Sequence, residues 1–360
     1  MHYTCRFLII LIAIALLQGC DQRPAESMLE RYSNRVANSL DSDAELNLDI
    51  QLQLPAYPRR RERIQPVTDL RQGLIEVLNL RHCQLINLIA ERNSSLGKVM
   101  PPSRQLVYEI RLIFRLGSCR QSLRMSQTET DPQLLRQVEE IFQIKKINFE
   151  AALWNGLFTS EAMERNFSLS EPPLSLTGDD GFSQSRQALL TFNRLAALNN
   201  DLTLPQRGWA EPDYLDQLEP HYQALSTLRF GSRWLRSIYL VTYTLNHTAS
   251  VIEQRLKQRP LCFNKKATPQ ALIVKNVFNK YYAGELQPYM ARADREGREW
   301  LQLNHRLLQN FNYIPAAMQR YQRQIINPDG PLWQNYTSAR ERHTKAWQQL
   351  LSQCNLMPGT

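Results

Sequence analysis

Apolar residues recur at spacings of three and four along most of the chain, which is the period of one buried helix face. Such stripes predict helices that begin near Thr68, Ser103 and Asp131, and another helix over about residues 184–199. Proline or a short polar side chain precedes most of these stripes, as is typical of a helix start. The pattern therefore predicts an all-α fold.

The second half of the chain continues this pattern. One long helix is expected from Pro220 to about Lys257, and another begins at Thr268 and is kinked or broken by Pro288. A last helix follows a predicted turn at residues 327–330. Because the predicted helices are long and the turns short, we expect an elongated multi-helix bundle with long antiparallel helices.

Two stretches depart from the helical pattern. Over residues 46–54 every second residue is apolar, which predicts an extended segment or a small hairpin. Residues 168–183 are polar, with two consecutive prolines and two glycines, and are the best candidate for an interior linker. We therefore expect a helical domain over residues 68–360, subdivided near this linker, behind an N-terminal segment at 20–67 with a short helix and a basic linker.

The first twenty residues have the pattern of a lipoprotein signal peptide. Arg6 precedes an uninterrupted apolar run at residues 7–17, and the letters LQGC occupy positions 17–20. Eleven residues rise only about 16 Å as a helix, too little to cross a hydrocarbon core of about 30 Å. The run therefore predicts a signal peptide over residues 1–19 rather than a membrane span. LQGC resembles the lipobox of bacterial lipoproteins, which implies cleavage before Cys20 and acyl chains, palmitate among them, on that residue.

This N-terminus predicts where the protein works. Two or more acyl chains on Cys20 would anchor the chain stably to a membrane. The acidic Asp21 that follows resembles the signal that keeps a lipoprotein in the inner membrane, so we favour the inner over the outer membrane. No later stretch approaches 18 consecutive apolar residues, so we expect the rest of the chain to face the periplasm. The alternative is an ordinary signal peptide with an incidental cysteine.

Charge adds a preference among partners. The 360 residues carry 43 Lys and Arg against 34 Asp and Glu, a net charge of +9, and 34 of the 43 cations are arginine. Arginine binds carboxylate and phosphate groups in a bidentate manner. Since nucleic acid is a poor partner outside the cytoplasm, we expect an envelope protein or an anionic glycan or lipid instead.

Four arginines lie between two prolines close to the predicted anchor. They are Arg59, Arg60, Arg61 and Arg63. We regard them as candidates for contact with anionic headgroups, where each basic residue contributes about 1 kcal/mol. The alternative is a solvated linker whose charges form intramolecular ion pairs.

The six cysteines divide into three groups. Cys5 leaves with the signal peptide and Cys20 carries lipid, so four remain in an oxidising compartment, where three disulfide connectivities are open. A helical hairpin would bring one pair together, and the other pair would tie the C-terminal helix to the loop after Pro260. We favour the pairs Cys83–Cys119 and Cys262–Cys354. A metal-binding or catalytic thiol is less favoured because no C-x-x-C motif occurs.

Several short motifs together resemble one family. They are the lipobox, Arg92-Asn93-Ser94-Ser95-Leu96-Gly97, Pro102-Ser103 and Tyr108-Glu109. This set is similar to an uncharacterised family of proteobacterial lipoproteins, the domain of unknown function 3080, over most of the mature chain. The resemblance includes cysteines spaced like Cys83 and Cys119. It supports an envelope location and brings no activity, ligand or cofactor.

Motifs for catalysis are weak. Residues 95–98 match the S-x-x-K motif of penicillin-binding proteins, but the companion S-x-N and K-T-G elements are absent. Glu26-Ser27 resembles the Glu-Ser pair of lytic transglycosylases, yet it lies six residues from the predicted anchor without the companion motifs. The histidines show no zinc-binding spacing; they are His82, His221, His247, His305 and His343. We therefore expect no catalytic residue, metal or cofactor.

Two polar clusters have both a binding and a structural interpretation. Arg92, Asn93, Ser94 and Ser95 lie in a predicted loop and could bind an anion or a glycan; alternatively, they satisfy the last helix carbonyls while Gly97 turns the chain. A second cluster is acidic, and a solvated first helix turn explains it better than a calcium site. It consists of Glu211, Asp213, Asp216 and Glu219.

Together these patterns favour a non-enzymatic, lipid-anchored helical protein that binds or scaffolds another component of the bacterial cell envelope. The alternative is an enzyme that modifies peptidoglycan or lipid with an active site assembled from residues distant in sequence. A pocket with converging carboxylates, or Ser95 beside a buried Lys98, would favour the enzyme.

Overall fold

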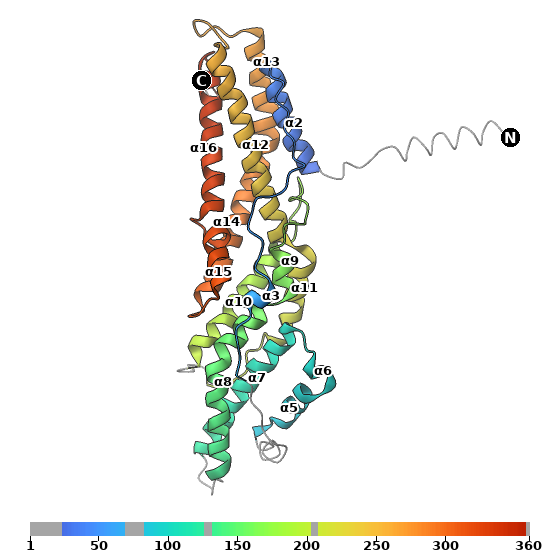
Figure 1. Ribbon diagram of the computed structural model, residues 1–360, viewed down its shortest axis with the longest axis vertical. Helices are drawn as coiled ribbons and strands as arrows, with labels where there is room; N and C mark the ends of the chain where they lie inside the picture. The colour runs from blue at the N-terminus through green and yellow to red at the C-terminus, as the bar shows by residue number, and fades with distance from the viewer. Residues whose placement is uncertain (1–23, 69–82, 126–131, 203–207, 358–360) are drawn as a thin grey trace, which may run out of the picture.

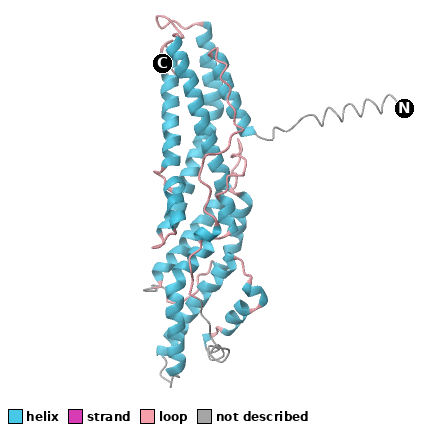
Figure 2. Ribbon diagram, in the orientation of Figure 1, coloured by secondary structure: helices cyan, strands magenta, loops and turns pink. Residues whose placement is uncertain are grey.

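The chain folds into a long bundle of helices. The computed structural model describes residues 24–68, 83–125, 132–202 and 208–357. Within these ranges no strand is formed, and loops join the helices (Figure 2). The predicted all-α class is therefore confirmed. The predicted signal peptide and Cys20 lie outside the described residues, as does most of the helix expected after Thr68.

The helices follow one another with short connections. Their bounds are α2 Pro24–Ser39, α3 Arg60–Arg63, α5 Ile86–Asn93, α6 Ser95–Lys98, α7 Pro102–Met125, α8 Pro132–Phe158, α9 Glu161–Asn166, α10 Phe182–Asp201, η2 Leu215–Gln217, α11 Leu218–Leu228, α12 Phe230–Gln258, α13 Pro269–Val277, η3 Phe278–Leu286, α14 Gln287–Gln309, α15 Ala316–Tyr321, η4 Gln322–Ile326 and α16 Pro331–Ser352. Of these, η2 is a 3-10 helix, and η3 and η4 are π-helices. None of the described helices is both long and apolar enough to cross a membrane.

The bundle has two halves that share one elongated body. In one half α2, α12, α13, α14 and α16 lie side by side, and in the other α7 and α8 form a hairpin beside which α5 and α6 project (Figure 1). The long helices α7 and α8 are antiparallel, since Arg120 pairs with Glu139 while Glu109 pairs with Lys145. Helices α12 and α16 run parallel instead, because each of these helices ends at the same end of the molecule (Figure 1).

Large aromatic side chains fill the core where glycines let helices approach closely. Trp154, Trp234, Trp300 and Trp347 are all fully buried. The indole Nε1 of Trp234, on α12, donates a hydrogen bond to the Ala293 carbonyl on α14 (2.8 Å). A Cβ atom at Gly297 would lie 1.7 Å from that nitrogen. This position therefore requires glycine for the two helices to pack as they do.

The helix predicted from Pro220 to Lys257 is two helices, so that prediction was wrong. Arg229 breaks the chain between α11 and α12 with a left-handed backbone (φ 51°). Its guanidinium holds this corner by pairing with Glu171 and donating to the Ser226 carbonyl (2.9 Å). Apolar periodicity continues across the break, because the buried faces of both helices contact one core, and the pattern hides the corner.

Pro288 neither breaks nor ends its helix. Helix α13 begins at Pro269 with the Thr268 hydroxyl accepting the Ala271 N–H (3.1 Å), as predicted, and continues without interruption through η3 into α14. A proline removes one backbone donor and clashes with the carbonyl four residues earlier. The π-helical turn η3, which immediately precedes Pro288, re-registers the hydrogen bonds and accommodates the ring.

The segment at residues 46–54 is extended but forms no strand or hairpin. Leu46 and Leu48 are buried, and Ile50 and Leu54 pack against the core, whereas the residues between them face solvent. Each side of the segment thus keeps the two-residue period of an extended chain. It lies along the bundle as a single arm that connects α2 to α3 (Figure 1).

Residues 168–181 form a loop that packs along α12 and α14. The Leu174 N–H donates to the Ser237 hydroxyl (2.7 Å), and the Tyr289 hydroxyl donates to the Leu174 carbonyl (3.2 Å). Asp180 pairs with Arg233 (3.2 Å) and with a second arginine, Arg292, on α14 (3.4 Å). The loop is therefore attached to both helices by buried polar contacts.

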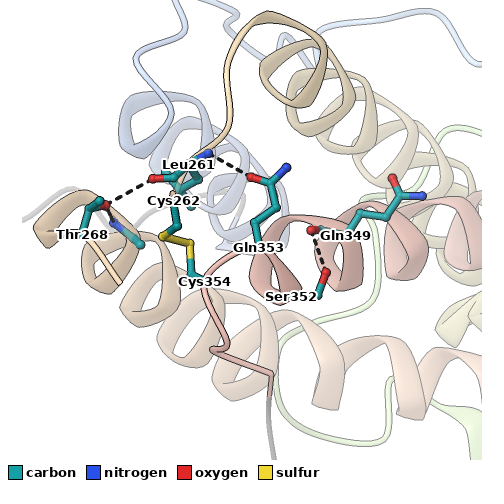
Figure 3. Close-up of a disulfide and its surroundings, with 8 residues drawn as sticks. Leu261, Cys262, Thr268, Gln349, Ser352, Gln353 and Cys354 are labelled. Atoms are coloured by element: carbon teal, nitrogen blue, oxygen red, sulfur yellow. Dashed lines mark hydrogen bonds between the residues drawn. A yellow bond between two sulfur atoms is a disulfide. The ribbon is translucent and has the colours of Figure 1, made fainter. Parts of the chain in front are cut away.

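Two disulfides cross-link the described chain in the favoured connectivity. Cys83, in a turn before α5, is bonded to Cys119 on α7, and Cys262 is bonded to Cys354. They close loops with sequence separations of 36 and 92 residues. The first attaches the α5–α6 projection to the bundle, and the second joins the α12–α13 connection to the end of α16 (Figure 3).

Candidate functional site

A groove lies between α16 and the continuous helix η3–α14. Its volume is about 450 Å³, and we call it the α14–α16 groove. It is lined by Tyr282, Gln287, Met290, Ala291, Asp294, Tyr336, Arg340, Glu341, Thr344, Lys345 and Gln348. The two helices run antiparallel along the groove. Tyr282 lies near the start of η3–α14 and Gln348 near the end of α16, whereas Asp294 lies further along α14 and Tyr336 near the start of α16.

Short side chains leave room between these helices, and an ion-pair cluster joins them. Ala291 and Thr344 are both small and exposed. Asp294 of α14 accepts from Arg340 of α16 (2.7 Å) and also from Arg298 of its own helix (3.1 Å). Two guanidinium groups on one carboxylate hold its orientation and neutralise its charge.

Two tyrosines form the aromatic part of the wall. Burial, aided by the nearby Asp294 carboxylate, raises the pKa of Tyr336 to about 12. Burial also raises the pKa of Tyr282. The Arg340 guanidinium lies 5.6 Å from the centre of the Tyr336 ring. Both phenols therefore stay neutral at ordinary pH, and the groove presents neutral aromatic surface beside fixed charges.

A buried polar cluster lies directly behind Tyr282. The ring of His343 on α16 is 4.8 Å from that of Tyr282, and His343 is fully buried. Its Nε2 lies 2.5 Å from the Tyr32 hydroxyl of α2, which also accepts from the Trp347 indole N–H (2.9 Å). The same indole N–H, which can only donate, also lies 3.2 Å from Nε2, so Nε2 is an acceptor; Tyr32 therefore donates its own proton to Nε2, and the imidazole proton resides on Nδ1. That Nδ1 has no hydrogen-bond partner among the described residues.

These groups are arranged for binding rather than for proton transfer. Burial lowers the pKa of His343 to about 3, so the imidazole is neutral at ordinary pH. Asp294 is held between two arginines, and no described serine or cysteine contacts His343 as a nucleophile would. The groove thus offers amide, hydroxyl, charged and aromatic side chains, which suits recognition of a polar, partly apolar chain.

The predicted Arg92–Ser95 cluster mainly stabilises its own turn. The Ser94 hydroxyl donates to the Glu91 carbonyl (2.7 Å) and accepts the Gly97 N–H (3.0 Å), so it ends α5 and caps α6. Arg92 donates to the Gly97 carbonyl, while Asn93 and Ser95 are exposed. Arg92 and Ser94 thus bind backbone groups at the helix ends, in line with the structural alternative given for this cluster.

We expected Gly97 to turn the chain after a helix, and this expectation was wrong. This glycine lies inside α6, where a Cβ atom would be 2.1 Å from the Glu91 carbonyl oxygen. Its role is therefore close approach of two backbone turns. Ser103 likewise does not cap the following helix, which begins one residue earlier; its hydroxyl donates to Glu219 (2.9 Å).

The two weak catalytic motifs gain no support from their surroundings. Lys98 is exposed, so Ser95 does not face a buried lysine. Glu26 is buried rather than free near the anchor, and its carboxylate accepts from Arg236 on α12 (3.0 Å). A buried carboxylate that pairs with an arginine of a neighbouring helix has a structural role.

The four arginines near the anchor separate into two kinds. Arg63 is fully buried, donates to the Phe158 carbonyl and to Glu164 (2.5 Å each), and stacks over Tyr57. It is therefore inaccessible to a membrane surface, and its inclusion in that prediction was wrong. Arg59, Arg60 and Arg61 are exposed. Arg60 borders a second cavity of about 420 Å³ that also contains Ile64 and Val67.

The acidic cluster and the histidines have structural roles. Glu211 pairs with Arg111 (3.4 Å) and Arg115 (2.5 Å), and Asp216 also pairs with Arg111 (2.6 Å), so these acids attach their loop to α7 rather than being simply solvated. His221 and His247 bond hydroxyl groups, His305 bonds Gln309, and His82 lies outside the described residues. In the described ranges no three metal-binding side chains gather.

Sequence reasoning did not find the α14–α16 groove. Its lining residues form no motif, because they come from two segments about fifty residues apart that only tertiary packing aligns. The signal that points to it is Pro288, since the helix accommodates this interior proline with a π-helical turn before it, and such turns often lie at functional sites.

This architecture defines the class of the molecule: an all-α, disulfide-bridged helical bundle with a lateral groove built from a π-helix-containing helix and its neighbour. The chain belongs to the family described as "Protein of unknown function (DUF3080)", whose model matches residues 29–358. That range includes every residue of the groove and both disulfides. The chain matches no curated protein and no solved structure.

Proposed function

We propose that this is a lipid-anchored protein of the bacterial cell envelope that faces the periplasm, attached to the inner membrane, and binds another envelope component in the α14–α16 groove. The lipobox ending at Cys20 supports the anchor, and two disulfides fit an oxidising compartment. The observation that carries the binding role is the groove itself, which combines amide, hydroxyl, charged and aromatic side chains and in which Asp294 is held by two arginines.

The proposed partner is an extended polar chain, either a segment of an envelope protein or a glycan strand. Such a chain presents hydrogen-bonding groups along its length, which Gln287, Gln348 and Lys345 match on the rim. Its apolar portions would contact Met290 and Tyr282. The alternative function, a peptidoglycan- or lipid-modifying enzyme, requires an acid and a base free to exchange protons, and the locked Asp294 disfavours it.

Filling the groove should abolish partner binding. A photoreactive amino acid at Gln348 should give a discrete crosslinked adduct in intact cells, identified by mass spectrometry. We expect Ala291→Trp, which places an indole in the groove, to weaken that adduct about tenfold, the equivalent of about 1.4 kcal/mol of lost contact.

The matched control is Asn335→Trp, on an exposed position of α16 outside the groove lining. It should leave the adduct at wild-type intensity. Equal loss in both variants would show a general effect of an added tryptophan, and adducts made only of bulk lipid would refute partner binding.

Lipid anchoring has a separate test. Cys20→Ser should reduce radioactive palmitate labelling of the chain to background and release it from the membrane fraction, because no other described feature spans the bilayer. Labelling that persists in this variant would refute the lipobox assignment. Cys5→Ser, in the same predicted signal peptide, is the control and should be labelled normally.

A further inference from the structure

One end of the molecule is formed by the connection between α12 and α13. We call residues 259–275 the tip; they include this connection and the first turns of α13 (Figure 1). The tip lies outside the α14–α16 groove and shares no lining residue with it. It combines two features, exposed apolar side chains and lysine as its main cation.

The centre of the tip is a tight turn with an unusual backbone. The Lys266 N–H donates to the Phe263 carbonyl (3.1 Å), and these two residues form an isolated antiparallel bridge. Between them Asn264 and Lys265 both have left-handed backbones (φ 52° and 58°). Two successive left-handed residues define the tightest hairpin turn, and lysine adopts this conformation only where its surroundings impose it.

The base of the turn is fixed to the bundle. Cys262 is bonded to Cys354, beyond the end of α16, and the Leu261 N–H donates to the Gln353 side chain (2.9 Å) (Figure 3). On the other side Thr268 caps α13 and also bonds the Leu261 carbonyl. These contacts present the turn as a rigid projection, so little conformational entropy is lost when it binds.

The outer side of the tip is apolar. Phe263 is 71% exposed, and on the adjacent face of α13 Leu272 and Ile273 are 50% and 56% exposed. The opposite face of α13 is buried through Ala271 and Val274. The three side chains thus leave half or more of their surface exposed to solvent.

Lysines surround these apolar residues. The chain has only nine lysines, and five of them lie between residues 257 and 280. Most ion pairs among the described residues use arginine, whereas no acidic partner pairs with Lys265 or Lys266 in the described chain. The nearby Asp41 is occupied by Arg259 (3.1 Å) and Gln270 (2.8 Å). The tip therefore carries free positive charge.

We propose that the tip is a membrane-contact site that inserts Phe263 into the headgroup region of an anionic bilayer. An exposed aromatic ring favours the interface between headgroups and acyl chains, where Leu272 and Ile273 would also be partly buried. Lysine heads remain in the aqueous layer beside anionic phosphates, while their stems lie along apolar surface. The tip projects outward and combines an exposed aromatic ring with lysines that lack an acidic partner among the described residues, which matches a fluid anionic lipid surface.

Together with the proposed lipid anchor at Cys20, contact of the tip with the membrane sets the orientation of the bundle relative to the bilayer. Helix α2 has 16 residues and rises about 24 Å from Pro24 toward the tip, where the Ser39 carbonyl accepts from Gln270. Pro24 follows Cys20 by four positions, which span at most about 14 Å. An upright molecule would leave its lipid about 10 Å short of the surface that the tip touches. The bundle therefore leans, with one side toward the membrane.

The test places an environment-sensitive fluorescent amino acid at Phe263 in the full-length protein and adds vesicles of phosphatidylethanolamine with 30% phosphatidylglycerol. We expect a blue-shifted emission and quenching by brominated acyl chains. The matched control places the same fluorophore at Ile147 on α8, a site that is 78% exposed and follows two lysines. Its emission should not change.

Two further measurements test the role of the lysines and distinguish a lipid surface from a second copy of the protein. Lys265→Gln together with Lys266→Gln should lower the ratio of membrane-inserted to free protein about 25-fold, which is about fivefold for each lysine. Replacing the anionic vesicles by phosphatidylcholine vesicles should lower this ratio for the wild-type protein to a similar extent. An unchanged emission at 263 with anionic vesicles overturns the proposal. So does a blue shift that needs no vesicles and grows with protein concentration, because the tip would then cover a second copy. Palmitate labelling tests the lipid anchor at Cys20 independently, so failure of the anchor hypothesis can be distinguished from failure of the tip hypothesis.

Discussion

Replacing Cys262 and Cys354 by serine is expected to lower the free energy of unfolding by about 5 kcal/mol. The disulfide closes a loop with a sequence separation of 92 residues, and in the loop-entropy model the loss grows with loop length. It also joins the α12–α13 connection to the end of α16, beside the hydrogen bond from the Leu261 N–H to the Gln353 side chain. Urea unfolding of the oxidised proteins, followed by circular dichroism at 222 nm, measures the change.

The comparison is the double variant Cys83→Ser with Cys119→Ser. Its loop has a separation of 36 residues, so the same model predicts a smaller loss of about 4 kcal/mol. Its effect should also concentrate on the α5–α6 projection, with less influence on the bundle around α12. If the 262–354 variant unfolds at the same urea concentration as the wild-type protein, the disulfide contributes no net stability and this expectation is refuted.

Acid should destabilise the protein through His343. The pKa of this histidine is about 3 in the folded protein, against 6.5 when exposed, because burial disfavours the imidazolium. Above pH 6.5 the imidazole is neutral in both states, and its full contribution is present. Between pH 6.5 and 3 only the unfolded chain takes up the proton, so stability falls as the pH falls. The loss is about 3 kcal/mol between pH 7 and pH 4.

The variant His343→Phe isolates this effect. It should be somewhat less stable at pH 7, since Tyr32 loses the acceptor for its proton. Its free energy of unfolding should nevertheless fall by about 3 kcal/mol less than that of the wild-type protein between pH 7 and pH 4. The control His305→Phe replaces a histidine that bonds Gln309 at the helix surface, and it should keep the wild-type slope. Parallel pH profiles for all three proteins would exclude His343 as the acid-sensitive group.

Local features of the chain were predictable where neighbouring residues alone decide the structure. Thr268 and Pro269 start α13 as their side chains dictate, and the alternating apolar residues at 46–54 form an extended arm. The same local logic failed at Arg229. A left-handed arginine carries no composition signal, and it is held there by Glu171, 58 residues earlier in the chain.

Charged residues show the same division. Arg59, Arg60, Arg61 and Arg63 are indistinguishable in sequence, yet only Arg63 is buried. What separates it is the Phe158 carbonyl and Glu164, which α8 and α9 bring to its guanidinium. An isolated charge would be expelled from such a site, whereas a charge with hydrogen-bonding partners can be retained. The identity of those partners depends on packing, not on spacing along the chain.

The sequence by itself determined the helical class, most helix starts, the extended arm and the favoured pairs of cysteines, because periodicity, caps and cysteine chemistry act over a few residues or limit the choices to a handful. Only the tertiary structure decided the α14–α16 groove, the burial of His343 beside Tyr32 and the free lysines of the tip. Each of these depends on which helix faces lie together, and that choice is made by close packing of side chains far apart in sequence.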